Sequence, residues 1–244
     1  MNYTKSQKYT DFYKIYDNCS GPGGLQISEF LAEKMAVKPG KRLIDIGFYR
    51  GYQTCFLAKE YDVNIVAIDP GEKIGDREYG IEYLMKNARD FGIDDKIIGV
   101  KTGVPNTLLP SACFDYAIST NCLHMIKGWS GSEGYLAALK EICRLLKKGG
   151  VLGIGEPYCN NVAMSAEAKS AYEEVNWGYA PIEESVKIIE EAGFTILETD
   201  HANEANKWWN EYATYGTGDA DERKFIEADN NQWLSFGYTV AIKE

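Results

Sequence analysis

Short apolar runs alternate with amphipathic segments along most of this chain. The first run covers residues 42–46 and ends at a turn bracketed by Gly47 and Gly51, after which a helical pattern covers 52–61 and a second apolar run covers 64–68. A short, almost wholly apolar run bounded by glycines is typical of a buried parallel strand. The order strand, turn, helix, strand therefore predicts a βαβ unit.

The alternation continues toward the C-terminus. The patterns predict helices over 76–91, 133–146, 163–175 and 182–192, and strands over 96–101, 113–119, 151–156, 194–199 and 238–243. Gly149 and Gly150 are expected to stop the helix that precedes them. We therefore expect one α/β domain spanning 1–244, with a seven-stranded, mostly parallel sheet, helices on both faces and an antiparallel last strand.

The glycine turn predicts a binding site for a ligand with an adenosine half. Glycine lets a ligand approach the backbone where a strand turns into a helix, and the helix start offers free N–H groups. Asp69, which follows the second apolar run, is placed to accept hydrogen bonds from both hydroxyls of a ribose. Asp45, just before the first glycine, would repel a pyrophosphate and suits a cationic group instead.

The motifs resemble those of the class I, Rossmann-like methyltransferases that use S-adenosylmethionine, small-molecule type. The resemblance covers roughly residues 21–200 and includes, in order, 43–47, 66–69, 102–104, 114–118, 121–124, 146–157 and 192–194. It implies a Rossmann-like sheet, S-adenosylmethionine as cofactor, and in-line transfer of a methyl group to a nitrogen, sulfur or oxygen of a small molecule. The cofactor contacts it implies are Asp45, Gly47, Tyr49, Gly51, Asp69, Gly103, Val104 and Asn121.

Two positions depart from the resembled pattern. Tyr49 stands where the family usually has glycine, and Val104 where it often has aspartate. We expect the Tyr49 ring to lie against the cofactor, and the adenine to be recognised by backbone groups near Gly103 and Val104.

His124 and several aromatic residues are candidates for the acceptor end of the site. His124 follows the fourth strand and is either a general base or substrate contact, or simply a packed side chain. In the resembled family an N-terminal helix and turn, here 1–24, act as a lid, and an insertion, here 158–181, covers the substrate. The tentative substrate contacts are Tyr13, Tyr16, Glu156, Trp177 and Tyr179. The tyrosines could equally pin the first helix to the sheet. An aromatic pocket suits a small neutral or cationic acceptor.

The composition indicates which partners and which cellular compartment to expect. The 244 residues carry a formal charge of −10 without a basic patch, which argues against a nucleic-acid partner. No apolar run is long enough to cross a membrane, and the polar start does not read as a signal peptide. Six cysteines without a Cys-x-x-Cys pair indicate reduced thiols in the cytoplasm. No metal-binding spacing is present, and oligomeric state is not indicated.

Two other functional classes remain. A nicotinamide-dependent oxidoreductase is disfavoured because the third glycine of its fingerprint is missing and because Asp45 is acidic. A non-catalytic protein that binds S-adenosylmethionine is the second alternative, for which Tyr49 and Val104 are the hints.

Overall fold

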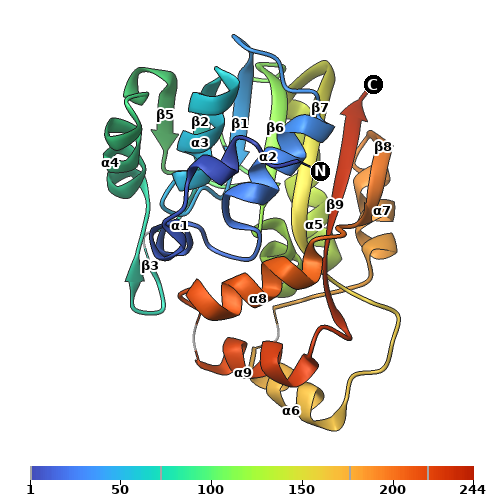
Figure 1. Ribbon diagram of the computed structural model, residues 1–244. Helices are drawn as coiled ribbons and strands as arrows, with labels where there is room; N and C mark the ends of the chain where they lie inside the picture. The colour runs from blue at the N-terminus through green and yellow to red at the C-terminus, as the bar shows by residue number, and fades with distance from the viewer. Residues whose placement is uncertain (1, 72, 176, 219) are drawn as a thin grey trace.

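A single twisted sheet organises the molecule (Figure 1). The computed structural model describes residues 2–71, 73–175, 177–218 and 220–244. Its seven strands lie in the order β5-β2-β1-β6-β7-β9-β8. They are β1 (Arg42–Ile46), β2 (Asn64–Ile68), β5 (Ile97–Val100), β6 (Phe114–Thr120), β7 (Leu146–Cys159), β8 (Phe194–His201) and β9 (Leu234–Lys243). The strand β9 lies between β7 and β8 and is antiparallel to both, while the other neighbours are parallel. The predicted fold class is confirmed.

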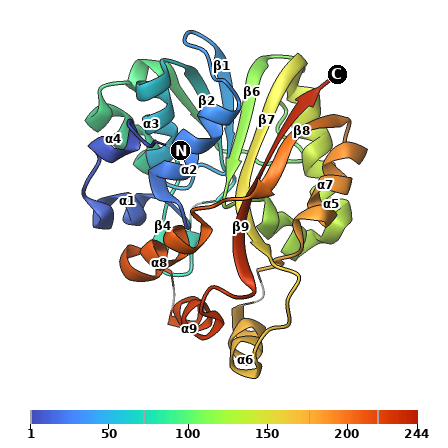
Figure 2. The ribbon, with the colours of Figure 1, turned by 45° about the vertical axis from the view of Figure 1, so that its right-hand side comes forward.

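Helices cover both faces of this sheet, as Figure 2 shows from the side. One layer contains α1 (Phe12–Asn18), α2 (Gly24–Lys34), α3 (Tyr52–Tyr61) and α4 (Ile81–Phe91), and the other contains α5 (Leu123–Leu145) and α7 (Ile182–Glu191). Successive strand residues point to opposite faces, so Leu43 packs into the first layer and Ile44 into the second. The sheet is thus buried on both sides, which is why its strands are almost wholly apolar.

The remaining elements gather beyond the carboxyl ends of the parallel strands. They are α6 (Ala166–Val175), α8 (Ala205–Tyr215), α9 (Ala220–Asp229) and the small hairpin of β3 (Lys73–Ile74) and β4 (Arg77–Glu78). In Figure 1 the helices α6 and α9 lie together below the sheet, and they contact each other. We call the segment 158–181, which contains α6, together with α9 the cap.

Two predicted helices have different bounds in the structure. The helix expected over 76–91 begins only at Ile81. Gly75, with φ of 56°, lies in the turn of the β3–β4 hairpin, and Gly80, with φ of 118°, is the residue before the helix. The helix expected from 133 begins at Leu123 and is kinked at Gly131, where φ is 64°. It ends at Leu145, before the glycine pair at 149–150, which lies within the start of β7 rather than stopping the helix.

Three helices were not predicted: α2, α8 and α9. In α2 the side chains of Leu25, Ile27, Phe30 and Leu31 are all buried, and so is Glu29. A helix buried on most of its surface lacks the one-sided apolar stripe by which a helix is recognised in sequence.

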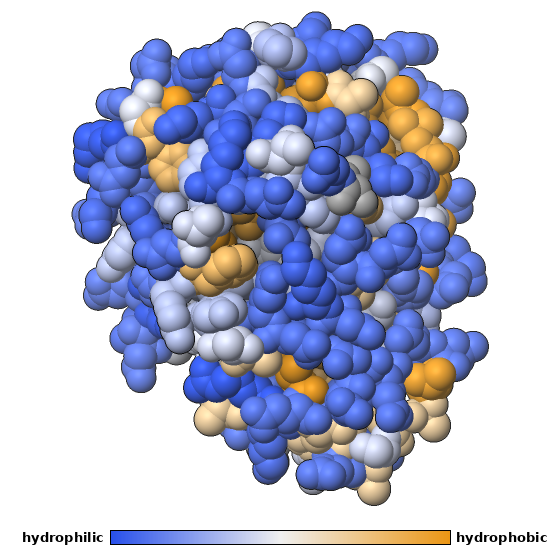
Figure 3. Space-filling model, in the orientation of Figure 1, coloured by the Kyte–Doolittle hydropathy of each residue, from blue (hydrophilic) through white to orange (hydrophobic). Residues whose placement is uncertain are grey.

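The outer surface in the view of Figure 3 is mostly hydrophilic, with small separate hydrophobic patches. Among the described residues, no helix combines the length and apolar character that crossing a membrane would require.

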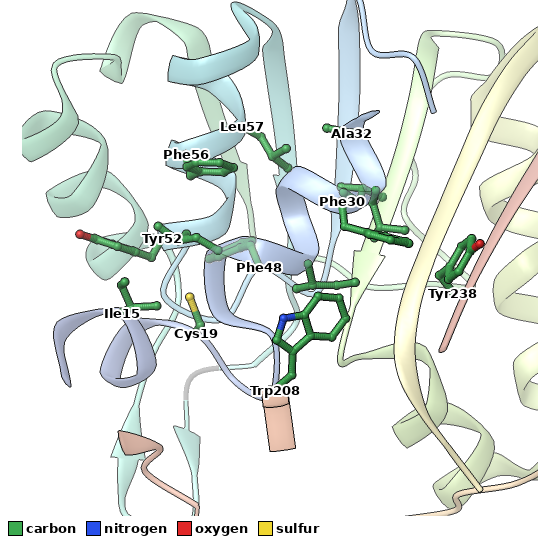
Figure 4. Packing of buried hydrophobic residues seen from close by; sticks show 14 of the residues in the cluster. Ile15, Cys19, Phe30, Ala32, Phe48, Tyr52, Phe56, Leu57, Trp208 and Tyr238 are labelled. Carbon is green, nitrogen blue, oxygen red and sulfur yellow. The ribbon is translucent and has the colours of Figure 1, made fainter. Parts of the chain in front are cut away.

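Trp208 joins the C-terminal helix α8 to the main core. Its side chain is fully buried, edge-on to Phe30 and Phe236 at centroid distances of 6.1 and 5.5 Å. Figure 4 shows it beside Phe30, close to the strand that carries Tyr238. Its Nε1 donates to Gln26 Oε1 at 3.1 Å. One ring therefore connects α2, α8 and β9.

Replacing Trp208 with alanine should lower the free energy of unfolding by about 3–5 kcal/mol, because a large cavity forms where α2, α8 and β9 meet. Chemical denaturation measures this change. Trp129→Ala is the matched control, because Trp129 is 70% exposed and its loss should cost no more than about 0.5 kcal/mol. Equal losses in the two variants would contradict the connecting role of Trp208.

Candidate functional site

A cavity of about 750 Å³ opens at the carboxyl edge of the sheet, between the sheet and the cap. This volume lies within the range of small-molecule sites, and the position is where open α/β sheets bind ligands. Its walls come from the glycine turn after β1, the loops after β2, β5 and β6, the start of α5, the hairpin and the cap.

Six of the eight predicted cofactor residues line one end of the cavity. They are Gly47, Tyr49, Asp69, Gly103, Val104 and Asn121. The other two residues, Asp45 and Gly51, are not among the residues that line the cavity.

Asp45 is buried beneath the turn and accepts a hydrogen bond from Thr54 Oγ1 at 2.5 Å. Burial raises the pKa of its carboxyl to about 7. Gly51 is the residue before α3 and has φ of 75°. A Cβ there would lie 2.1 Å from Leu84 Cδ1, so this glycine allows α3 and α4 to pack closely.

The glycine turn is held close to the loop after β6. Gly47 has φ of 81°, and its N–H donates to the Ile68 carbonyl at 2.8 Å. A Cβ on Gly47 would lie 2.2 Å from Cys122 Sγ. Only glycine fits this approach, which brings the two loops together at the floor of the cavity.

Asp69 connects the glycine turn to the end of β2. Its Oδ2 accepts the Tyr49 N–H at 3.0 Å and its Oδ1 accepts the Gly71 N–H at 2.9 Å. Burial raises the pKa of this carboxyl, and the two backbone bonds oppose the rise. Each carboxylate oxygen has room for a second hydrogen bond, so Asp69 can bind a pair of hydroxyls while it holds the loop.

Tyr49 faces the cavity, as expected of a residue that replaces the usual glycine. It adopts a left-handed backbone conformation with φ of 54°, and its ring packs against Tyr79 at a centroid distance of 5.2 Å. Arg77 Nη1 donates to its hydroxyl at 3.4 Å. The hairpin therefore covers this end of the cavity. From residue 76 onward it lies where a helix was predicted.

Asn121 lines the cavity and has a buried acceptor without a partner among the described residues. Its Nδ2 donates to the Pro22 carbonyl at 3.1 Å, and its buried Oδ1 has no partner among the described residues. A buried polar atom without a partner costs about 1–3 kcal/mol, a cost that a bound ligand with a donor would remove.

Aromatic rings surround the opposite, acceptor end. Trp177 and Tyr179 line it as predicted. Three other aromatic side chains also line this end and were not predicted as substrate contacts: Trp129, Trp209 and Tyr212. The last two belong to an aromatic cluster at 208–212 that is visible in the sequence.

The backbone of the cap lies directly against the backbone of α5 at this end. Gly178 has φ of 74°, and a Cβ on it would lie 2.5 Å from Gly128 Cα. The segment that carries Trp177 and Tyr179 is thereby pressed against the first turns of α5.

Three predicted substrate contacts do not line the cavity. Tyr13 is 69% exposed and packs edge-on against Tyr215. Tyr16 is buried against α8, where its hydroxyl donates to Glu211 Oε2 at 3.2 Å. Glu156 is 1% exposed and lies behind the wall. The two tyrosines fix α1 to the body of the protein. Of the segment 1–24, residues 20–22 reach the cavity.

His124 lines the acceptor end and is 7% exposed. Burial lowers the pKa of its imidazole to about 3, so the ring is neutral near pH 7. Its ring lies 5.6 Å from that of Tyr179, and its buried Nδ1 has no hydrogen-bond partner among the described residues.

Asp69→Ala should weaken binding of S-adenosylmethionine by about 1–3 kcal/mol, because the acceptor of two ribose hydroxyls is lost. Isothermal calorimetry measures the change. Since the backbone N–H groups of Tyr49 and Gly71 also lose their acceptor, thermal unfolding must show that the variant remains folded. Unaltered affinity in a folded variant would contradict the assignment.

Comparison with known proteins agrees with this geometry. Residues 44–154 match a family model described as a methyltransferase domain. The chain is 27% identical over 193 residues to the sterol 24-C-methyltransferase of Schizosaccharomyces pombe, an alignment that covers 74% of this chain and 47% of that protein. It spans about half or less of the length of the first curated relatives it matches.

Two solved structures show the same fold. Phosphoethanolamine N-methyltransferase 2 of Haemonchus contortus, in complex with S-adenosyl-L-methionine, superposes with a TM-score of 0.74 at 16% identity, covering 100% of this chain and 60% of that one. The cyclase SpnF superposes with a TM-score of 0.72 at 18% identity, covering 90% and 80%. Together with the family match and the glycine turn, this likeness leads to one conclusion. Residues 44–154 carry a methyltransferase domain, and the chain has the Rossmann-like fold of the class I methyltransferases.

Proposed function

We propose that this protein transfers a methyl group from S-adenosylmethionine to a nitrogen, sulfur or oxygen atom of a small-molecule acceptor. The observation that carries the proposal is a single cavity with two chemically different ends. One end has the glycine turn, Asp69 and the free Asn121 Oδ1, and the other is walled by aromatic rings. In-line displacement needs two reactants aligned in a site that excludes water, and this cavity can hold both.

The residues at the first end fit the cofactor. Asp69 has acceptor capacity for the ribose hydroxyls, and Asn121 Oδ1 can accept from the amino group of the methionine part. Gly103 and Val104 line the same end, and we assign the adenine to their backbone. When bound, the cofactor supplies a methyl group on a sulfonium, whose positive charge already activates the leaving group. The protein then has to align, desolvate and, for a protic acceptor, remove one proton.

The acceptor end suits a small neutral or cationic molecule. Its rings offer apolar contact and ring-face attraction to positive charge. Arg77 is the one cation among the described lining residues, and it belongs to the hairpin at the cofactor end, so no described Lys or Arg lines the acceptor end. The charges therefore favour a neutral or cationic acceptor over one that carries a phosphate, although a phosphoethanolamine methyltransferase shares the fold.

The domain organisation, the partners and the cellular compartment belong to the same proposal. We treat 1–244 as one domain in which 158–181 caps the acceptor end and the turn at the end of 1–24 closes the edge. The net charge of −10 argues against a nucleic-acid partner. All six cysteines are free, which suits the reducing cytoplasm.

Formation of S-adenosylhomocysteine tests the activity. The protein is incubated with S-adenosylmethionine and a panel of phenols, thiols, amines and apolar alcohols, and product is measured by mass spectrometry. We expect at least one acceptor class to give product above the rate without acceptor. Because the fold also occurs in a cyclase, cofactor binding without product from any class would favour the non-catalytic alternative. Calorimetry with NADH, which should show no binding, tests the oxidoreductase alternative.

Tyr179→Ala should reduce methyl transfer by roughly tenfold or more while cofactor affinity stays near normal, because water enters the acceptor end and alignment is lost. Tyr13→Ala is the matched control, since Tyr13 is an exposed tyrosine outside the cavity. Single-turnover rates and cofactor titrations separate the two effects. A Tyr179 variant with the original rate would show that the cap does not shield the reaction.

A further inference from the structure

Glu156 is fully buried behind the acceptor end and has three hydrogen-bond donors. Its Oε1 accepts the hydroxyls of Tyr135 and Tyr158 at 3.3 and 3.2 Å. Its Oε2 accepts the backbone N–H of His124 at 2.8 Å. A carboxylate has about four acceptor positions, two on each oxygen. One position on Oε2 therefore remains open.

The open position lies next to the imidazole of His124. The His124 Nδ1 is 3.9 Å from Glu156 Oε2, too long for a hydrogen bond but without an alternative partner among the described residues. The His124 Nδ1 and the Glu156 side chain are both buried, while the His124 side chain lines the cavity. Hydrogen bonds of catalytic groups are often long in the free enzyme and shorten in the complex.

We infer that Glu156 holds His124 in the tautomer that carries its proton on Nδ1, so that Nε2 presents a lone pair to a neutral hydroxyl-bearing acceptor in the cavity. This inference rests on the proposed methyl transfer and assigns its acceptor class. The hydroxyl proton passes to Nε2 as the oxygen forms its bond to the methyl group and the bond from methyl to sulfur breaks. The imidazolium that results is paired with the Glu156 carboxylate. Glu156 is a positioning residue, and His124 is the group that touches the acceptor.

The charges around the pair give this arrangement a defined pH dependence. Burial raises the pKa of Glu156 to about 7, while its hydrogen-bond donors and Lys127 oppose the rise. The other groups that face it are Tyr135, Tyr158 and Cys122, whose pKa values burial raises, so they stay neutral. Ser185 of α7 hydrogen-bonds to both tyrosines. As the pH falls through about 7, Glu156 gains a proton, becomes a donor toward Nδ1, and should move the histidine proton to Nε2.

Nitrogen-15 NMR of the histidine rings tests the tautomer without any substrate. The chain has two histidines, so a His201→Asn variant assigns both sets of signals. We expect the Nδ1–H form of His124 to dominate at pH 8 and to decline as the pH falls through about 7. In Glu156→Gln this pH dependence should disappear between pH 6 and 8.

Glu29→Gln is the matched control. Glu29 is equally buried, at 1% exposure, but accepts the backbone N–H groups of Lys5 and Ser6 away from the cavity. It should keep the wild-type tautomer and its pH dependence. If Glu156→Gln lost stability but kept the wild-type tautomer profile, or if the wild type carried the proton on Nε2 at pH 8, the inference would be overturned.

Binding of phenol and anisole, with S-adenosylhomocysteine present, tests the acceptor class. Phenol should shift the Nε2 signal and bind on the order of fivefold more tightly than anisole, which has no proton to donate. Equal affinities without a shift would overturn the assignment of a hydroxyl acceptor. Calorimetry of S-adenosylhomocysteine alone reports on the cofactor end, so loss of that binding would instead indicate failure of the proposed function.

Discussion

The close approach of the glycine turn to the loop after β6 is the constraint on which the site depends. Gly47 leaves no space for a side chain beside Cys122, and Asp69 fastens the same turn by accepting the Tyr49 N–H. The turn therefore has one position relative to the sheet. Because Asp69 uses only part of its acceptor capacity in this way, one carboxylate can both shape the floor of the cavity and bind a ligand there.

Burial explains why the polar groups of the site differ in role. Asp45 and Glu156 are both carboxyls whose pKa burial raises to about 7, and neither reaches the cavity. Each supports a residue that does: Asp45 lies beneath the turn, and Glu156 lies beside His124. Because these carboxyl groups lie behind the residues that line the cavity, they can affect the position and protonation of those residues without occupying the cavity.

The sequence predicted the sheet, and it identified residues that come together at one end of the cavity, because those features are local. A buried strand followed by glycine and then by an acidic residue is a pattern within one βαβ unit, and Gly47 and Asp69 lie where it placed them. The acceptor end depends on contacts between distant segments, and no local pattern reports them. Tyr16 looked like a pocket residue and packs against Glu211 instead, whereas Trp209 and Tyr212 reach the cavity through α8. The helix α2 was missed because it is buried on most of its surface, and the hairpin was missed because residues from 76 onward were read as the start of a helix.

The contact between Gly128 and Gly178 has a consequence for how this protein could diversify. Main chain lies against main chain there, so the two glycines set how closely the cap approaches α5 at this point, whatever rings stand at Trp177 and Tyr179. Exchanging either ring would alter the shape and polarity presented to an acceptor while leaving the frame in place. Acceptor preference could therefore drift in evolution, or be redesigned, by single substitutions at these two positions, provided that both glycines are retained.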